Sequence, residues 1–259
     1  MNMSLQLATK QYVVMGVANE RSIAWGVAKR LLEENATVIF TYRKDRSKAK
    51  IEKLLADYSD KQTALFACDV NDDASIANAF TQIGEQFGHI DGIVHSVAFA
   101  HAEDLRTDFV NTSRDGYAFA QDTSAYSLVA VAKAAKPYFT PTASIVTMSY
   151  LGAERVLPGY NVMGVAKAAL EAAMRYLAYD LGAAGIRVNA ISAGAIRTLA
   201  AKGVPSFNDI LHKIEDESPL RRNTNQAEVA DMTLVMLSPL SRGVTGETIY
   251  VDSGYHIMG

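Results

Sequence analysis

The sequence predicts an α/β protein: a single-domain, Rossmann-like, doubly wound parallel sheet of about seven strands, with a substrate-binding lid. Three observations support this prediction. Short apolar runs alternate with longer helical patterns along the whole chain. The apolar runs are rich in β-branched residues, as strands buried on both faces should be. No Pro-, Gly- or Ser-rich linker divides the chain, so one domain over residues 1–259 is expected.

The strand and helix patterns follow one another in chain order, which favours right-handed crossovers between parallel strands. Apolar runs of four to six residues predict strands at Tyr12–Gly16, Thr37–Tyr42, Ala64–Cys68, Gly92–Ser96, Ser144–Met148, Arg187–Ile191 and Thr248–Val251. Helical patterns lie at about Ser22–Glu34, Asp73–Phe87, Tyr117–Ala135, Tyr160–Leu181 and Ala227–Leu237.

One segment departs from this alternation. Residues 196–218 follow the sixth strand and contain Gly203 and Pro205 beside a short amphipathic piece, FNDILHKIEDE. Connections of this length are usually functional lids or disordered segments. We therefore expect a lid over a site at the strand ends, with a static surface excursion as the alternative.

Composition excludes several classes of protein. The formal net charge of −3 gives no electrostatic case for nucleic acid as a partner. Cys68 is the only cysteine, so no intrachain disulfide can form. The first residues lack the pattern of a signal peptide, and no apolar run is long enough for a membrane span, so a cytoplasmic protein without membrane attachment is expected. The five histidines show no compact zinc spacing, and no metal is expected.

The first strand runs into a glycine turn and then a helix that starts at a serine. This arrangement holds dinucleotide pyrophosphates, because backbone N–H groups and the helix dipole face the anion. Gly16 would let the backbone approach the cofactor, Ser22 would cap the helix, and Gly26 would let the helix pack close to the strand. Since G-x-G-x-x-G is absent, an ordinary βα turn is the alternative.

Two further strand ends favour a dinucleotide site. Asp69 ends the third strand with a carboxylate suited to the adenine amino group, and residues 95–100 end the fourth with small side chains. Ligands of open α/β sheets bind outside the carboxyl ends of the strands, where all three segments would meet.

The second strand ends in two cations, which bears on the choice of cofactor. An NAD-specific site generally offers a carboxylate to the ribose 2′-hydroxyl at this point. Here Arg43 and Lys44, with Ser47, could bind a 2′-phosphate, although Asp45 partly offsets their charge. We predict NADPH as the preferred cofactor, with NADH possible; the alternative is that these residues only solvate a surface loop.

The segment after the fifth strand carries a tyrosine and a lysine on one predicted helix face. Tyr160 and Lys167 are seven residues apart, and two helical turns bring them within about 20° of each other. The positive charge of a lysine favours an ionised phenol, and its ammonium can also hold ribose hydroxyls. The alternative is a packed tyrosine with an exposed lysine.

The fold and this pair resemble the short-chain dehydrogenase/reductase superfamily, whose usual signature is Tyr-x3-Lys with a serine about 13 residues before the tyrosine. Here Met163 stands at the tyrosine position and Tyr150 at the serine position. Tyr-x6-Lys with a second tyrosine ten residues earlier resembles the bacterial-type enoyl-(acyl-carrier-protein) reductases. The motifs HSVAFA, YNVMGVAKA, RVNAISAG and VDSG extend the resemblance along the chain. Ala195 departs from it, since the family commonly has proline there.

The resemblance implies an enzyme that reduces trans-2-enoyl thioesters on acyl carrier protein with NAD(P)H, in the last step of fatty-acid elongation. It implies that Tyr160 donates to the developing enolate oxygen, that Tyr150 lines the site, and that Lys167 holds the nicotinamide ribose. It also implies a homotetramer.

The family's binding residues map onto matching positions. The resemblance places the cofactor against Gly16, Ser22, Ile23, Asp69, Val70, Val97, Lys167, Ile196, Arg197, Thr198, Leu199 and Ala200. It places Ala100 near the thioester. The acyl chain would need apolar walls, for which Met163, Phe207, Ile210 and Leu211 are suitable, with plain core packing as the alternative.

Two rival functions remain open at this point. The first is another reductase of the superfamily, such as a 3-ketoacyl reductase, which Met163 and Tyr150 disfavour. The second is a non-catalytic dinucleotide-sensing protein on the same fold, since fold does not determine function. The Tyr160 and Lys167 pair disfavours the second.

Overall fold

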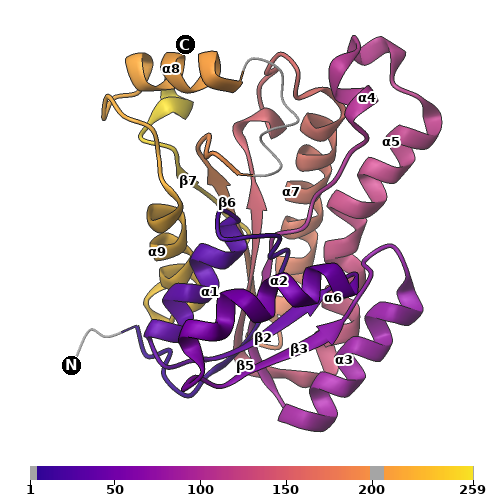
Figure 1. Ribbon diagram of the computed structural model, residues 1–259, viewed down its shortest axis with the longest axis vertical. Helices are drawn as coiled ribbons and strands as arrows, with labels where there is room; N and C mark the ends of the chain where they lie inside the picture. The colour runs from indigo at the N-terminus through magenta and orange to yellow at the C-terminus, as the bar shows by residue number, and fades with distance from the viewer. Residues whose placement is uncertain (1–4, 199–206, 259) are drawn as a thin grey trace.

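A computed structural model of the protein describes residues 5–198 and 207–258, without the side chain of Phe207. Its centre is one sheet of seven strands in the order β3-β2-β1-β4-β5-β6-β7, and every neighbouring pair is parallel (Figure 1). The strands are β1 Gln11–Met15, β2 Thr37–Tyr42, β3 Thr63–Ala67, β4 Ile90–His95, β5 Phe139–Ser149, β6 Arg187–Ala193 and β7 Thr248–Val251. All seven predicted strands are confirmed, and the order reverses between β1 and β4, which is where such sheets bind ligands.

Helices cover both faces of the sheet (Figure 1). They are α1 Ile23–Glu33, α2 Asp45–Leu55, α3 Asp73–Phe87, α4 Ala102–Arg106, α5 Arg114–Gln121, α6 Ser127–Ala135, α7 Asn161–Gly182, α8 Phe207–Glu217 and α9 Gln226–Leu237. Successive strand residues point into two separate cores, as the two-residue period of a strand requires. Val13 packs with α3, α6 and α7, whereas its neighbour Val14 packs with α1 and α9.

The structure adds helices that the sequence analysis does not predict. The basic segment after β2 forms α2. Ile51 is its one fully buried side chain, and the other side chains of α2 are exposed or half-buried. The short helix α4 follows the loop after β4. The sequence of α2 is mostly charged, and α4 has only five residues, so neither gives an apolar pattern that marks a helix.

The predicted helix over Tyr117–Ala135 is divided. A π-helical turn, Asp122–Tyr126, separates α5 from α6. The Ser127 hydroxyl donates to the Thr123 carbonyl at 2.7 Å, and the Ser124 hydroxyl bonds the backbone of Phe99 after β4. The Ser124 contacts hold the turn against the segment after β4, and π turns of this kind often lie at functional sites.

Two absences hold for the part of the chain that the structure describes. No helix there is long and apolar enough to cross a membrane. No group of three or more His, Cys, Asp or Glu side chains is arranged to hold a metal ion in those same residues.

Candidate functional site

The glycine turn after β1 is built around two serines. Gly16 has a φ of +96°, and a Cβ there would lie 2.0 Å from the Ser96 carbonyl oxygen, so glycine is required by the close approach of the segment after β4. The predicted cap at Ser22 is wrong in its detail. Ser22 occupies the N-cap position of α1, but its hydroxyl accepts from the N–H groups of Ala18 and Asn19, both at 3.0 Å. The hydroxyl therefore stabilises the turn before α1 and does not cap the helix.

Gly26 has its nearest neighbour on another helix. A Cβ on Gly26 would lie 2.6 Å from Cγ of Gln226, the first residue of α9, so the glycine makes room for α9. The side-chain amide of Gln226 donates to the carbonyls of Glu20 at 3.0 Å and Ser22 at 2.5 Å.

The ends of β2 and β3 bring opposite charges together. Arg43 Nε lies 3.5 Å from Asp69 Oδ2, and both side chains are substantially exposed. Lys44 is exposed, and its carbonyl accepts from the Ser47 N–H at 2.7 Å at the start of α2. Val70 is buried in the core beside them. Three of these residues, Arg43, Lys44 and Ser47, were expected to bind a 2′-phosphate, and they lie on one short stretch of backbone.

The end of β4 carries a buried histidine. His95 lies between Thr147 Oγ1 and Ser127 Oγ, each 3.0 Å from one ring nitrogen. Burial, and secondly the charge of Lys167, lower the pKa of His95 to about 3, so the ring is neutral and acts as a structural link between β4, β5 and α6. Val97 and Ala100 follow in the half-buried loop after β4.

The two tyrosines of the predicted catalytic segment are in contact. Their rings lie 5.0 Å apart, centroid to centroid, at 75° to each other. Burial raises the pKa of Tyr150 to about 12, and burial followed by the neighbouring Tyr150 raises the pKa of Tyr160 further. Lys167 is not among the causes of either pKa shift, and both phenols stay protonated at neutral pH.

Two glycines that the sequence analysis overlooks hold Tyr160 in place. A Cβ on Gly152 would lie 2.3 Å from Cδ1 of the Tyr160 ring, and a Cβ on Gly164 would lie 2.7 Å from the Gly152 carbonyl oxygen. The turn after β5 and the first turn of α7 can approach this closely only because both residues lack a side chain. Spacing alone gives no sign of the contact, because the two segments meet only in three dimensions.

Lys167 is buried at the end of β5. Its Nζ donates to the Met148 carbonyl at 2.6 Å, so the predicted alternative of an exposed lysine is wrong. Burial lowers the pKa of Lys167 to about 8, and Glu171, one turn along α7, partly opposes that shift. The Ser149 hydroxyl donates to the Glu171 carboxylate. Two side chains of α7 therefore bind two successive residues of β5, Met148 and Ser149. Glu171, like Gly152 and Gly164, is a residue that sequence reasoning did not single out.

The remaining predicted residues lie near these ends or outside the described chain. Met163 is buried with its sulfur 3.8 Å from Ser124 Oγ of the π turn. After β6, Ile196 is half-buried, and Arg197 donates to Asn208 Oδ1 of α8 at 2.6 Å. Thr198 is the last described residue before the gap. Leu199, Ala200 and the side chain of Phe207 lie outside the described part of the chain.

Ala195, the departure noted in the sequence, has a packing role. It is buried against Leu211 and Ile214 of α8, with Ile210 and the C-terminal Tyr255 beside them. The residue after β6 therefore anchors the helix that follows, and α8 lies beside the C-terminal end of the chain (Figure 1).

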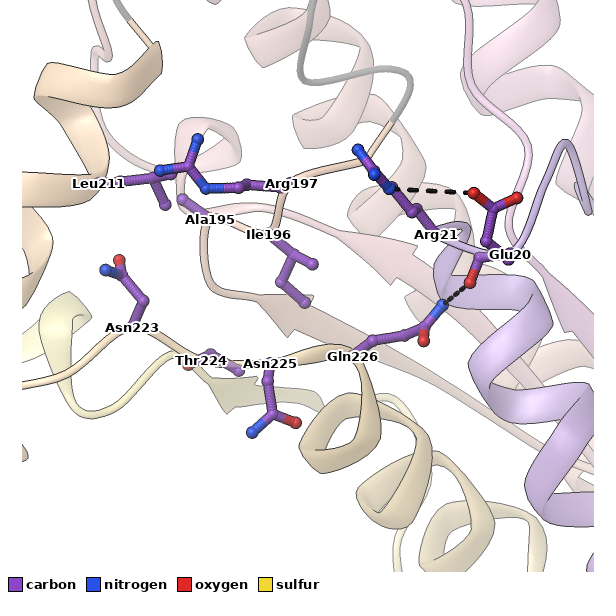
Figure 2. A pocket seen from close by; sticks show the side chains of 10 residues that line it. All are labelled: Glu20, Arg21, Ala195, Ile196, Arg197, Leu211, Asn223, Thr224, Asn225 and Gln226. Carbon is purple, nitrogen blue, oxygen red and sulfur yellow. Dashed lines mark hydrogen bonds and ion pairs between the residues drawn. The ribbon is translucent and has the colours of Figure 1, made fainter.

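A pocket of about 320 Å³ lies between the glycine turn and the segment after β6. Figure 2 shows Glu20 and Arg21 on one side and Arg197 and Leu211 on the other, with residues 223–226 leading into α9. The pocket thus lies between the first βα turn and the segment of Ile196 and Arg197, and its lining does not include Asp69, Tyr160 or Lys167.

The family of the chain is evident from its relatives. A family model described as enoyl-(acyl carrier protein) reductase matches residues 16–256. The chain is 55% identical over 252 residues to an enoyl-(acyl-carrier-protein) reductase (NADPH) of Staphylococcus aureus, covering 97% of this chain and 98% of that protein. It is 53% identical over 253 residues to an enoyl-(acyl-carrier-protein) reductase (NADH) of Bacillus cereus, covering 98% and 99%.

Solved structures are similarly close. The crystal structure of the Bacillus cereus enoyl-acyl carrier protein reductase with NADP+ and indole naphthyridinone matches with a TM-score of 0.96 and 53% identity, covering 99% of this chain and 100% of that chain. The enoyl-(acyl-carrier-protein) reductase (NADH) of Aquifex aeolicus matches with a TM-score of 0.93 and 40% identity, covering 99% of both chains.

Proposed function

This chain belongs to the enoyl-(acyl-carrier-protein) reductase family, a branch of the short-chain dehydrogenase/reductase superfamily, and from that premise we propose how its own residues carry the reaction. It reduces trans-2-enoyl thioesters to acyl thioesters with NAD(P)H, the last step of the fatty-acid elongation cycle. It is therefore an oxidoreductase that acts on a carbon–carbon double bond.

We propose that Tyr160 is the catalytic donor. When bound, the reduced nicotinamide supplies a hydride to C3 of the enoyl group. Negative charge then develops through C2 onto the thioester oxygen, where a hydrogen-bond donor gives the largest stabilisation, and a proton from solvent at C2 completes the reduction. Tyr160 suits this role because its raised pKa keeps the phenol protonated, and the Tyr150 ring 5.0 Å away fixes its orientation. The single observation that carries the proposal is this pair of tyrosines, with Met163 in the ketone-reducing position.

Lys167 would hold the cofactor at the reacting end. An ammonium has three N–H donors, and Met148 takes one of them, which leaves two for the nicotinamide ribose hydroxyls. We propose this contact and a positive local field as the functions of Lys167, while Tyr150 lines the substrate side.

The glycine turn fits a pyrophosphate. The Ser22 carbonyl accepts from the N–H groups of Trp25 and Gly26, and within the described residues the N–H groups of Ile23 and Ala24 have no acceptor. Free N–H groups at a helix N-terminus bind anions, so these two would face the pyrophosphate. We propose that Gly16, Ser22, Ile23, Asp69, Val70, Val97 and residues 196–200 complete the cofactor site.

The preferred cofactor is a separate proposal. One relative is named for NADPH, another for NADH, and a related crystal structure holds NADP+. We propose a preference for NADPH because Arg43 and Lys44 are exposed at the end of β2 and Ser47 lies one turn on, as a 2′-phosphate needs. The ion pair with Asp69 already orients the Arg43 guanidinium, so the side chain loses less conformational freedom when a 2′-phosphate binds.

We also propose the partners and the substrate side of the site. Ala100 and Met163 would lie near the thioester and the acyl chain. Residues 196–218, which include α8 and Phe207, would form the lid of a single catalytic domain. An acyl carrier protein would deliver the substrate, as the names of the relatives imply for those proteins, to a homotetramer in the cytoplasm.

One assay tests the proposed reaction and the preferred cofactor together. Oxidation of NADPH and of NADH, followed optically, is measured with a crotonyl thioester and with an acetoacetyl thioester. Turnover with the crotonyl thioester alone is expected. Equal or faster turnover of the acetoacetyl thioester would make the chain a ketone reductase and overturn the role of Tyr160.

A further inference from the structure

We propose that Gln226 is a positioning residue for cofactor binding: its side chain holds the turn of residues 16–22 in the conformation that receives the pyrophosphate. The proposal rests on the cofactor site proposed above. Gln226 begins α9 and lies 204 positions from Ser22 in the sequence, yet the two are in direct contact. Figure 2 shows the Gln226 amide reaching the backbone of Glu20 at the edge of the pocket.

The amide uses both of its N–H groups on the turn. One nitrogen, Nε2, lies 3.0 Å from the Glu20 carbonyl oxygen and 2.5 Å from the Ser22 carbonyl oxygen. A primary amide has two N–H donors, so a single side chain satisfies both acceptors. The Ser22 oxygen also accepts from Trp25 at 3.0 Å and Gly26 at 3.1 Å, so it points along α1 and away from the helix N-terminus.

The direction of these carbonyls matters because the cofactor is an anion there. A carbonyl oxygen carries partial negative charge and would repel a pyrophosphate, whereas an N–H group attracts it. The Ser22 hydroxyl already occupies the N–H groups of Ala18 and Asn19. The N–H groups of Ile23 and Ala24 are thus left to face the anion, provided that the Glu20 carbonyl stays turned toward the Gln226 amide and the Ser22 carbonyl stays directed along α1.

Gly26 gives independent support. A Cβ at this position would lie 2.6 Å from Cγ and 2.9 Å from Cδ of Gln226. Glycine in a helix interior weakens the helix, and here its effect is to leave room for this one side chain. The chain therefore provides, on two distant helices, both the amide and the space that the amide needs.

The contact is not needed to form α9. The N-terminus of α9 is closed by a capping box in which Asn225 accepts from the Glu228 N–H at 3.0 Å and the Glu228 carboxylate accepts from the Asn225 N–H at 2.9 Å. The side chain of Gln226 is free of that box and is directed to the turn.

The test uses the full-length enzyme with Gln226→Met, which keeps the length of the side chain, and Gln226→Glu, which places a carboxylate against two carbonyls. Gly26→Ala reaches the same contact from the other helix. Asp231→Asn is the matched control, because Arg30 Nε and Asp231 Oδ1 join α1 to α9 at 2.7 Å without touching the turn. Binding of NADPH is measured by calorimetry, and KM and kcat with a crotonyl thioester.

We expect the Kd and KM for NADPH to rise about tenfold in Gln226→Met, as two ordinary hydrogen bonds would give, and further in Gln226→Glu. The value of kcat at saturating NADPH should stay near that of the wild type, and Asp231→Asn should leave all three unchanged. By itself, Gly26→Ala should raise the Kd and KM for NADPH. In a double variant with Gln226→Ala, in which the added methyl has space, Gly26→Ala should add nothing to the effect of Gln226→Ala.

Unchanged Kd in folded Gln226→Met and Gln226→Glu would overturn the positioning role, as would a loss confined to kcat. A wild-type enzyme that binds neither NADPH nor NADH would instead overturn the proposed cofactor site itself. The two failures are therefore separate results.

Discussion

Replacing Lys167 by methionine tests the electrostatics of the site through the stability of the fold. The ammonium is buried, with one hydrogen bond to the Met148 carbonyl and a nearby carboxylate at Glu171. Burial lowers the pKa of Lys167 from the ordinary 10.5 to about 8, so the folded protein holds this proton less tightly than the unfolded chain does. Methionine has a similar length and no charge to bury.

The sign and size of the effect follow from proton binding. Above about pH 8 the folded protein releases the proton, while the unfolded chain keeps it until about pH 10.5. The unfolded state binds more protons in that interval, so the free energy of unfolding of the wild type rises with pH across it. Each tenfold difference in proton affinity is worth about 1.4 kcal/mol, which gives a rise of about 3 kcal/mol.

The assay is urea unfolding of the cofactor-free wild type and Lys167→Met from neutral pH to pH 10.5. His95, whose pKa is lowered mainly by burial and secondly by Lys167, stays neutral throughout this range, so the difference in unfolding free energy isolates Lys167. We expect the wild type to gain about 3 kcal/mol relative to the variant over this range. A flat difference would mean that Lys167 has an ordinary pKa, and the account of its burial would be wrong.

Three other substitutions bear on the site. Tyr160→Phe should lower turnover by about tenfold or more, since a general acid typically contributes about 10²–10⁴-fold, and leave the Kd for NADPH unchanged; wild-type turnover with chemistry rate-limiting would contradict this. Arg43→Ala/Lys44→Ala should reduce the ratio of kcat/KM for NADPH to that for NADH, by about tenfold or more if one charge-assisted hydrogen bond is lost, and an unchanged ratio would remove both residues from the 2′-phosphate site. Gly152→Ala should displace the Tyr160 ring, since the added Cβ would lie 2.3 Å from it, and lower kcat with little change in Kd; full activity would show that the ring position is not critical.

The sequence analysis predicts the sheet well because its evidence is local. A buried parallel strand such as β2 is an uninterrupted apolar run between turn residues, and that pattern is visible in the strand itself. The start of β5 is predicted less well: Pro141 lies inside a strand that begins at Phe139, and proline is rare within central strands. The π turn at Asp122–Tyr126 is not predicted because polar contacts across the sheet end determine it, and no periodicity marks it.

Some features of the site also follow from the local sequence, whereas others depend on the complete fold. The pairing of Tyr160 with Lys167 on one helix follows from spacing, which is a local property. The hydroxyl of Ser22 shows the limit of such reasoning. A serine before a helix can cap that helix, or it can accept hydrogen bonds from the preceding turn, as Ser22 does. Gly152 and Gln226 could not be predicted, since each acts on a residue brought near only by the complete fold.

The central claim is that the enzyme reduces the double bond of an enoyl thioester with Tyr160 as the donor to the developing oxygen anion. The most direct measurement is single-turnover reduction of a crotonyl thioester by saturating NADPH, in the wild type and in Tyr160→Phe. The account predicts rapid loss of reduced nicotinamide in the wild type and a rate lower by about tenfold or more in the variant, with the same amount of cofactor bound. Equal single-turnover rates in the two proteins would contradict it.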